Sequence, residues 1–308
     1  MSLPRLALSV IGDEIGRSLD EMISFAREHG VKRLDMRTVD GRSLLGMTKE
    51  EVIAISRTLE TAGISVPTFV SPMFKWPAPG KAPPAGKVDF AFNPTQCPVR
   101  EVVEYAMQIA IILGASNLRI FSYLRYEGFQ PGDMFAVSGD MGKLMGLAGQ
   151  YDITLQLENE PVCNIGNIAE LADFFTPREG AEDEELDHEE FGRRDNRLPH
   201  QIYLRPLVDI ANAWSTGEKP SDADMATLAP LTTAIHLKDR NLAAGRTVPL
   251  GDGDLPWPAE LRRLLSGVQT KEVLASIETH CPQDPRNATA RSLEGLRRIA
   301  AEIGVEIV

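Results

Sequence analysis

Four apolar stretches of the chain end at side chains that can bind a metal ion. The stretches and these side chains are ITLQLENEP (153–161) with Glu158, PLVDIAN (206–212) with Asp209, AIHLKDR (234–240) with His236, and ASIETH (275–280) with Glu278. A charge at the end of a buried strand is costly unless water, a partner or a metal ion compensates it. The four stretches therefore need one explanation.

The chain alternates between predicted strands and predicted helices. The predicted strands are LALSVI (6–11), VKRLDMR (31–37), ISVPTFV (64–70), SNLRIFS (116–122), ITLQLEN (153–159), LRPLVDI (204–210), TAIHLKD (233–239) and EVLASIE (272–278). Helical segments lie between them. One begins at Thr48, has Glu51 three residues on and ends at Gly63, which is the pattern of a capping box and a glycine C-cap.

Eight strands alternating with helices predict parallel βαβ units, and continuous apolar runs fit strands covered on both faces. We therefore predict a single-domain (β/α)8 TIM barrel over residues 1–308, a fold that typically needs about 250 residues. The excess length lies in two predicted long loop insertions, at about 74–95 and 177–200. The second is strongly acidic, with seven acidic residues among the ten at 181–190, which indicates a solvated loop.

In such a barrel the carboxyl ends of all strands meet at one mouth, where catalytic residues lie. Glu158, Asp209, His236 and Glu278 would come from strands five to eight and converge on half of that mouth. Three carboxylates left together raise one another's pKa, and a divalent cation removes that conflict. Three oxygen ligands and one imidazole suit Mn²⁺, Zn²⁺, Mg²⁺ or Co²⁺ and do not choose among them.

The sequence resembles a known family in the segments LENEP, LVDIANAW, AIHLKDR, VPLGDGDLPW and ASIETH, with LDMR (34–37) as an early motif. That family is the xylose isomerase-like TIM-barrel superfamily of sugar phosphate isomerases and epimerases. The resemblance implies one divalent metal ion held by Glu158, Asp209, His236 and Glu278. It also implies a sugar or polyol substrate, with Glu158 and Glu278 passing its proton in a metal-dependent isomerase or epimerase.

Five further residues are candidates for contact with the substrate. Lys238 lies two residues beyond His236, on the same face of a strand, and could neutralise an enediolate oxygen or a substrate acid group; the alternative is an ion pair with Asp239 at the rim. The others are His280, two residues past Glu278, with Arg37 of the LDMR motif, Asn212, and Trp76, whose ring with that of Phe74 could close over a sugar. Gly251 and Gly253 permit a tight turn beside the site.

The position of Asn212 separates this chain from two relatives within the superfamily. Abasic-site endonucleases hold three metal ions with extra histidines, and ketose 3-epimerases commonly have a histidine there. No histidine lies between His29 and His188 or between His236 and His280. A keto-inositol dehydratase of the same superfamily stays open as an alternative, as does a non-catalytic sugar-binding barrel, although none of the four ligands is lost.

The composition of the chain also limits the binding partners and the cellular location that we expect. The chain has 32 Lys and Arg against 44 Asp and Glu, a formal charge of −12, which argues against nucleic-acid binding. Its three cysteines show no CxxC pair, so we expect reduced thiols in a cytoplasmic protein. The start lacks the features of a signal peptide, and no apolar run approaches 18 residues, so we expect no membrane span. Barrels of the family often form dimers or tetramers, and a homo-oligomer fits this resemblance.

Overall fold

The computed structural model describes residues 3–82, 92, 97, 101–130, 132–136, 139–176 and 203–308. The predicted insertion at 177–200 lies outside these residues. The predicted insertion at 74–95 is described only at 74–82 and at residue 92.

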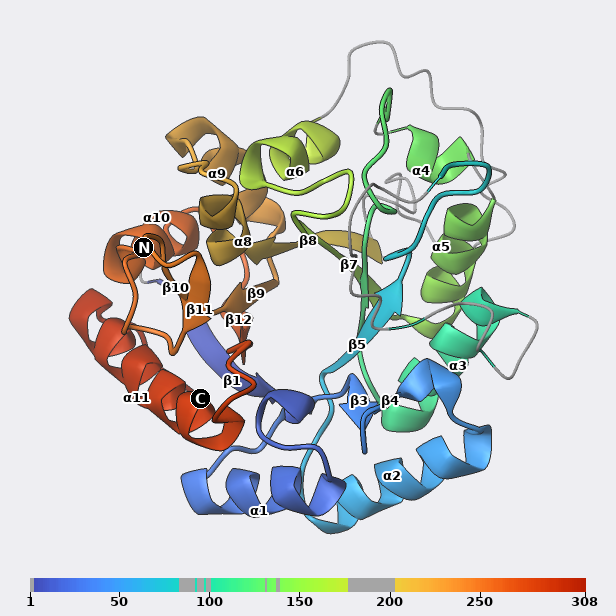
Figure 1. Ribbon diagram of the computed structural model, residues 1–308, viewed down its shortest axis with the longest axis horizontal. Coiled ribbons are helices and arrows are strands. Elements are labelled where there is room, and N and C mark those ends of the chain that lie inside the picture. The colour runs from blue at the N-terminus through green and yellow to red at the C-terminus, as the bar shows by residue number, and fades with distance from the viewer. Residues whose placement is uncertain are drawn as a thin grey trace.

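Eight strands form one parallel ring, in the spatial order β2, β1, β12, β9, β8, β7, β6, β5 (Figure 1). Their bounds are β1 Arg5–Ile11, β2 Leu34–Asp35, β5 Thr68–Met73, β6 Asn117–Ile120, β7 Thr154–Glu158, β8 Leu204–Asp209, β9 Ala234–Leu237 and β12 Glu272–Ile277. Parallel bridges from Arg33 to Ser65 and from Met36 to Phe69 join the two outer strands and close the ring. The prediction of a (β/α)8 barrel is confirmed.

Helices surround the ring, as the red, blue and green ribbons of Figure 1 show. They are α1 Leu19–His29, α2 Lys49–Thr61, α3 Val102–Leu113, α4 Asp133–Ala136, α5 Asp140–Tyr151, α6 Ile168–Phe175, α8 Ile210–Ser215, α9 Asp222–Leu228, α10 Trp257–Leu265 and α11 Pro285–Ile303, with 3₁₀ turns η1 Gly12–Glu14, η2 Leu44–Gly46 and η4 Ala229–Leu231. The predicted capping box at Thr48 and Glu51 is present and starts α2.

Two short hairpins lie at the mouth of the barrel. They are β3 Thr38–Val39 with β4 Arg42–Ser43, and β10 Asp239–Asn241 with β11 Arg246–Val248. Both pairs are antiparallel. Each hairpin directly follows a strand of the ring, so it extends the chain beyond the carboxyl end where the candidate residues lie.

The interior of the ring carries buried polar side chains below that end. Asp35 of β2 accepts hydrogen bonds from Ser276 Oγ of β12 at 2.5 Å and from the backbone N–H of Thr68 at 3.1 Å. Burial raises the pKa of Asp35 to about 6, although these hydrogen bonds oppose the shift. Most barrels fill this layer with branched apolar residues, so the polar floor ties three strands together under the candidate site.

None of the helices in the described part of the chain is both long and apolar enough to cross a membrane.

Candidate metal centre

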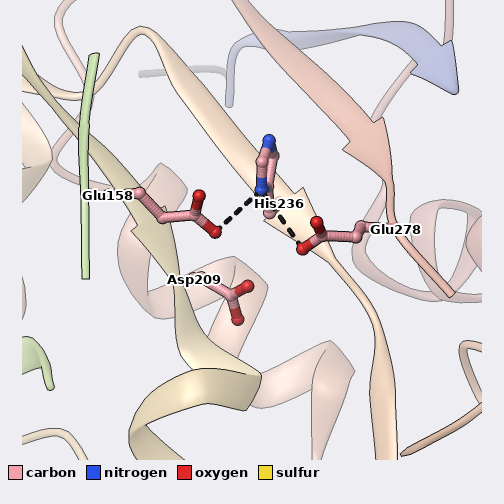
Figure 2. A group of neighbouring side chains, drawn as sticks. All are labelled: Glu158, Asp209, His236 and Glu278. Carbon is pink, nitrogen blue, oxygen red and sulfur yellow. Dashed lines mark hydrogen bonds and ion pairs between the residues drawn. The ribbon is translucent and has the colours of Figure 1, made fainter. Parts of the chain in front are cut away.

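The four predicted ligands come together at the ends of four neighbouring strands (Figure 2). Glu158 ends β7, Asp209 ends β8, His236 lies in β9, and Glu278 directly follows β12. One possible ligand atom from each lies within 4.8 Å of the others. All four residues are at most 2% exposed, so the group is a buried cluster and not a patch of surface acids.

The imidazole of His236 lies between the two glutamates. Its Nδ1 is 3.0 Å from Glu158 Oε1 and 3.4 Å from Glu278 Oε2. Burial favours the neutral ring, but the two carboxylates outweigh burial and raise the pKa of His236 to about 10. Burial likewise opposes the charge of Glu158, while His236 and Arg119 outweigh it and lower the pKa of Glu158 to about 2.

Two buried cations also belong to the cluster. Lys238 Nζ lies 2.6 Å from Asp209 Oδ2 and 2.7 Å from Glu278 Oε2, and the residue is 3% exposed. Arg119 of β6 donates from Nη1 to Glu158 Oε2 at 3.1 Å. Burial raises the pKa of Asp209, and the nearby Lys238 offsets only part of that shift. Lys238 therefore pairs inside the cluster, and the alternative of a rim ion pair with Asp239 is wrong.

Arg37 and His280 approach Glu278 from its other oxygen. Arg37 Nη1 lies 3.3 Å from Glu278 Oε1, and His280 Nε2 lies 3.3 Å from the same atom. Glu14 in η1 holds both cations in turn, at 2.7 Å from Arg37 Nη2 and 3.1 Å from His280 Nδ1. Sequence reasoning placed Arg37 and His280 near the pocket, and the structure brings both to the ligand cluster.

The amides of Asn159 and Asn212 lock the ends of β7 and β8 together. Asn159 donates from Nδ2 to the carbonyl of Asp209 at 2.8 Å and accepts from the Asp209 N–H at 2.9 Å. Asn212 donates from Nδ2 to the carbonyl of Asn159 at 2.8 Å, and its backbone N–H donates to Asp209 Oδ1 at 2.8 Å. The amide inside the sequence Glu-Asn-Glu thus fixes the spacing between two candidate ligands.

The side chain of Asp239 organises the glycine turn that follows β10 and β11. It accepts hydrogen bonds from the backbone N–H groups of Arg240, Gly251, Gly253 and Leu255, at 2.8 to 3.3 Å. A Cβ at Gly253 would overlap Asp239 Oδ1 and the carbonyl of Arg240. The GDGD segment is therefore a turn whose backbone N–H groups bind Asp239, and this packing explains Gly253 without a catalytic role.

Trp76 lies in the loop after β5, within an aromatic cluster. Its ring packs edge-on against Phe74 at 5.8 Å and lies 6.4 Å from Phe92. Phe74 itself adopts a positive φ of 64° and is buried. Four of the five predicted substrate contacts form a hydrogen bond or an ion pair with a candidate ligand. Among the described residues, Trp76 forms neither with these ligands.

Arg119 and Glu14 were missed from the sequence. Arg119 stands in the apolar strand LRIF, and a charge at such a position was the available signal. Its guanidinium also donates to the carbonyl of Ser71 at 3.2 Å and stacks 4.6 Å from the centre of the Phe121 ring. Glu14 follows the first strand without any motif, so its place beneath Arg37 depends on the three-dimensional packing of η1.

Comparison with known proteins places this geometry in a family. The family model described as the xylose isomerase-like TIM barrel matches residues 23–299. The chain belongs to this family. The resemblance stated from the strand-end motifs is thereby confirmed. No curated protein matches the chain.

Several solved structures share the fold of this xylose isomerase-like barrel at low sequence identity. The IolI protein with a bound zinc atom is 12% identical with a TM-score of 0.67, covering 97% of this chain and 99% of its own. The 3-keto-D-glucoside 4-epimerase YcjR of E. coli is 13% identical with a TM-score of 0.62, covering 96% and 100%. The probable 3-DHS dehydratase AsbF of Bacillus anthracis is 15% identical with a TM-score of 0.61, covering 94% and 99%.

The donor set fits a divalent cation. It offers three carboxylates and one imidazole, the ligand types that Mn²⁺, Zn²⁺, Mg²⁺ and Co²⁺ accept. The carboxylates are buried, so they need compensating positive charge, and the cluster already gathers cations around them. Residues that hydrogen-bond to the candidate ligands, such as Arg119 and Asn159, hold them in place, as metal sites generally require.

Proposed function

We propose that this chain is a divalent-metal-dependent sugar isomerase or epimerase. Its substrate would be a ketose or a polyol-derived carbonyl compound, and its reaction a proton transfer through an enediolate. The observation that carries the proposal is the convergence of Glu158, Asp209, His236 and Glu278 within 4.8 Å at the mouth of a xylose isomerase-like barrel. Enzymes of this architecture place their chemistry at that end of the strands.

In this proposal the four ligand residues hold one metal ion. When bound, such an ion polarises the substrate carbonyl as a Lewis acid and lowers the cost of the enediolate by several kcal/mol. Glu158 ends β7 and Glu278 directly follows β12, and these two strands are separated in the ring by β8 and β9. They therefore reach the substrate from different sides, so one carboxylate removes a proton and the other returns it.

The surrounding residues give the two oxygens of each glutamate different neighbours. Each keeps one oxygen near His236, namely Glu158 Oε1 and Glu278 Oε2. The other oxygens, Glu158 Oε2 and Glu278 Oε1, lie beside the guanidinium of Arg119 at 3.1 and 3.8 Å. We assign proton transfer to this second pair of oxygens, because the first pair faces the other ligands.

Substrate oxygens would meet the cations beside Glu278. Lys238, Arg37 and His280 all lie within 3.3 Å of that carboxylate, so a hydroxyl or carbonyl bound there reaches a donor. Asn212 and Trp76 are proposed from position alone. Asn212 lies one helical turn after Asp209, and Trp76 follows β5, which is separated from β7 in the ring by β6.

Relatives support the class of reaction and of cofactor. One neighbour carries a zinc atom and another is a 3-keto-D-glucoside 4-epimerase. The neighbour named as a 3-DHS dehydratase favours the second candidate, a dehydratase acting on a keto-inositol or similar ring. Both reactions begin by removing a proton beside a carbonyl, so the same two glutamates serve either outcome.

The test combines metal analysis with a substrate screen in heavy water. Purified protein is assayed for Mn, Zn, Mg and Co, then incubated in D₂O with a panel of ketoses and keto-inositols that is followed by NMR. We expect about one divalent ion per chain and deuterium at the carbon beside the carbonyl of one substrate class. Loss of water from the substrate instead identifies the dehydratase. Full activity of metal-free protein in chelator would refute the proposal.

A further inference from the structure

The ammonium of Lys238 lies between two of the four candidate ligands. It contacts Asp209 Oδ2 at 2.6 Å and Glu278 Oε2 at 2.7 Å, and it is almost completely buried. We propose that Lys238 competes with the divalent ion for these two carboxylates, and that the ion must displace the ammonium in order to bind. The inference rests on the metal centre of the proposed function and adds a built-in competitor to it.

The choice of oxygen supports competition. Glu278 Oε2, which Lys238 holds, is the oxygen turned toward the ligand group, since it also lies 3.4 Å from His236 Nδ1. Arg37 instead holds the other oxygen of Glu278, Oε1, at 3.3 Å. Arg119 likewise holds Glu158 Oε2, while Glu158 Oε1 faces His236. The two arginines therefore contact the outer oxygens, where a supporting cation belongs, and Lys238 contacts an inner one.

Electrostatics gives the competition its direction. A compact ammonium and a divalent ion that share the same carboxylates repel each other, and the repulsion is strong in a buried site. Lysine has a flexible four-carbon stem, so its charge can leave the carboxylates without backbone movement. The released ammonium would remain at the mouth, close enough to contact a substrate oxygen. Metal binding would thereby make Lys238 available to the substrate.

A supporting role for Lys238 predicts the opposite result. If the lysine positions Asp209 and Glu278 for the metal, its removal weakens metal binding, as removal of outer-shell partners generally does. If it competes, its removal strengthens metal binding, because the carboxylates lose their internal cation. The sign of the change in metal affinity therefore separates the two roles and needs no substrate.

The experiment measures the affinity of the whole protein for Mn²⁺ and Zn²⁺ by competition with a chelator. Lys238→Met removes the charge and keeps the length, Lys238→Gln keeps a hydrogen-bond donor without the charge, and Lys238→Arg keeps the charge. Lys75→Met is the matched control, because Lys75 pairs with Glu160 at 2.8 Å and contacts none of the four ligands in the described structure. Far-UV circular dichroism confirms folding of each variant.

We expect Lys238→Met and Lys238→Gln to bind the ions at least about tenfold more tightly than the wild type, as loss of a competing charge implies. Lys238→Arg should not bind more tightly, and Lys75→Met should stay within about twofold of the wild type. If the wild type binds metal and the folded neutral variants bind it equally or more weakly, the inference fails while the metal centre stands. If no variant and no wild-type protein binds an ion, both fail.

Discussion

Replacing Glu278 by glutamine tests the proposed chemistry most directly. The substitution keeps the size of the side chain and one oxygen, but removes the negative charge and the base. A positioned acid or base contributes about 10²–10⁴-fold in rate, or about 3–5 kcal/mol of activation free energy. We expect proton exchange at the reacting carbon to fall by that factor in Glu278→Gln and in Glu158→Gln.

The contacts of Glu278 suggest that its loss falls near the upper end of that range. Its two oxygens meet donors from Lys238 at 2.7 Å and from Arg37 at 3.3 Å. A glutamine must turn an NH₂ group toward one of these cations, which leaves a buried donor facing a charge of the wrong sign. Within the described part of the chain, Glu158 has one such partner at hydrogen-bond distance besides His236, namely Arg119.

The assay is NMR of substrate deuterium in D₂O, with metal content measured on the same samples. Glu160→Gln is the control, because Glu160 lies two residues beyond Glu158 and pairs with Lys75. It should keep its exchange rate within about threefold, as expected for a pair that is partly exposed. If Glu278→Gln exchanges the proton as fast as the wild type while still holding metal, the two-glutamate mechanism is wrong.

Three further substitutions probe the metal, its support and the turn beside it. His236→Ala should lose most of the bound metal in elemental analysis, and with it the stabilisation of roughly 3 kcal/mol that an ion at a hundred times its Kd confers in thermal unfolding. Arg119→Met leaves Glu158 with an unpaired buried oxygen and should cost about 3–5 kcal/mol in denaturant unfolding; an unchanged midpoint would contradict this. Gly253→Ala should destabilise by about 2–4 kcal/mol through overlap with Asp239, whereas Gly46→Ala, with open space around it, should change stability by less than about 1 kcal/mol.

The barrel was predictable because its strands carry their own signal. ITLQLEN alternates the apolar residues Ile153, Leu155 and Leu157 with polar ones and carries the charge of Glu158 near its end, and the structure places β7 at Thr154–Glu158, within the predicted 153–159. The second strand is shorter than its sequence predicts. The prediction ran over 31–37, but only Leu34–Asp35 forms regular pairs, with single bridges at Arg33 and Met36. Local sequence signals a strand but does not give the length over which its neighbours pair.

The candidate site was predictable where strand periodicity decides orientation. Two-residue alternation placed Lys238 on the face of His236, and both point into the cluster. The same alternation places Asp239 on the opposite face, where it accepts hydrogen bonds from backbone N–H groups, while Lys238 pairs with Asp209 and Glu278. Arg119 could not be assigned in this way, because no neighbouring ligand in its strand showed which face is internal.

Asn212 stands where the resemblance to abasic-site endonucleases and ketose 3-epimerases would place a histidine, and the structure shows what this asparagine does instead. Its side-chain amide donates to the carbonyl of Asn159 and its N–H to Asp209 Oδ1, so it fastens β7 to β8 directly beside two candidate ligands. A histidine side chain has no amide group, so it could not make the same hydrogen bond to the Asn159 carbonyl unless the backbone moved. In the described residues a second set of possible ligands, Glu14, Glu278 and His280, shares Glu278 with the first and is already held by Arg37. An asparagine in place of a histidine ligand favours the proposed single metal ion over a site for several ions.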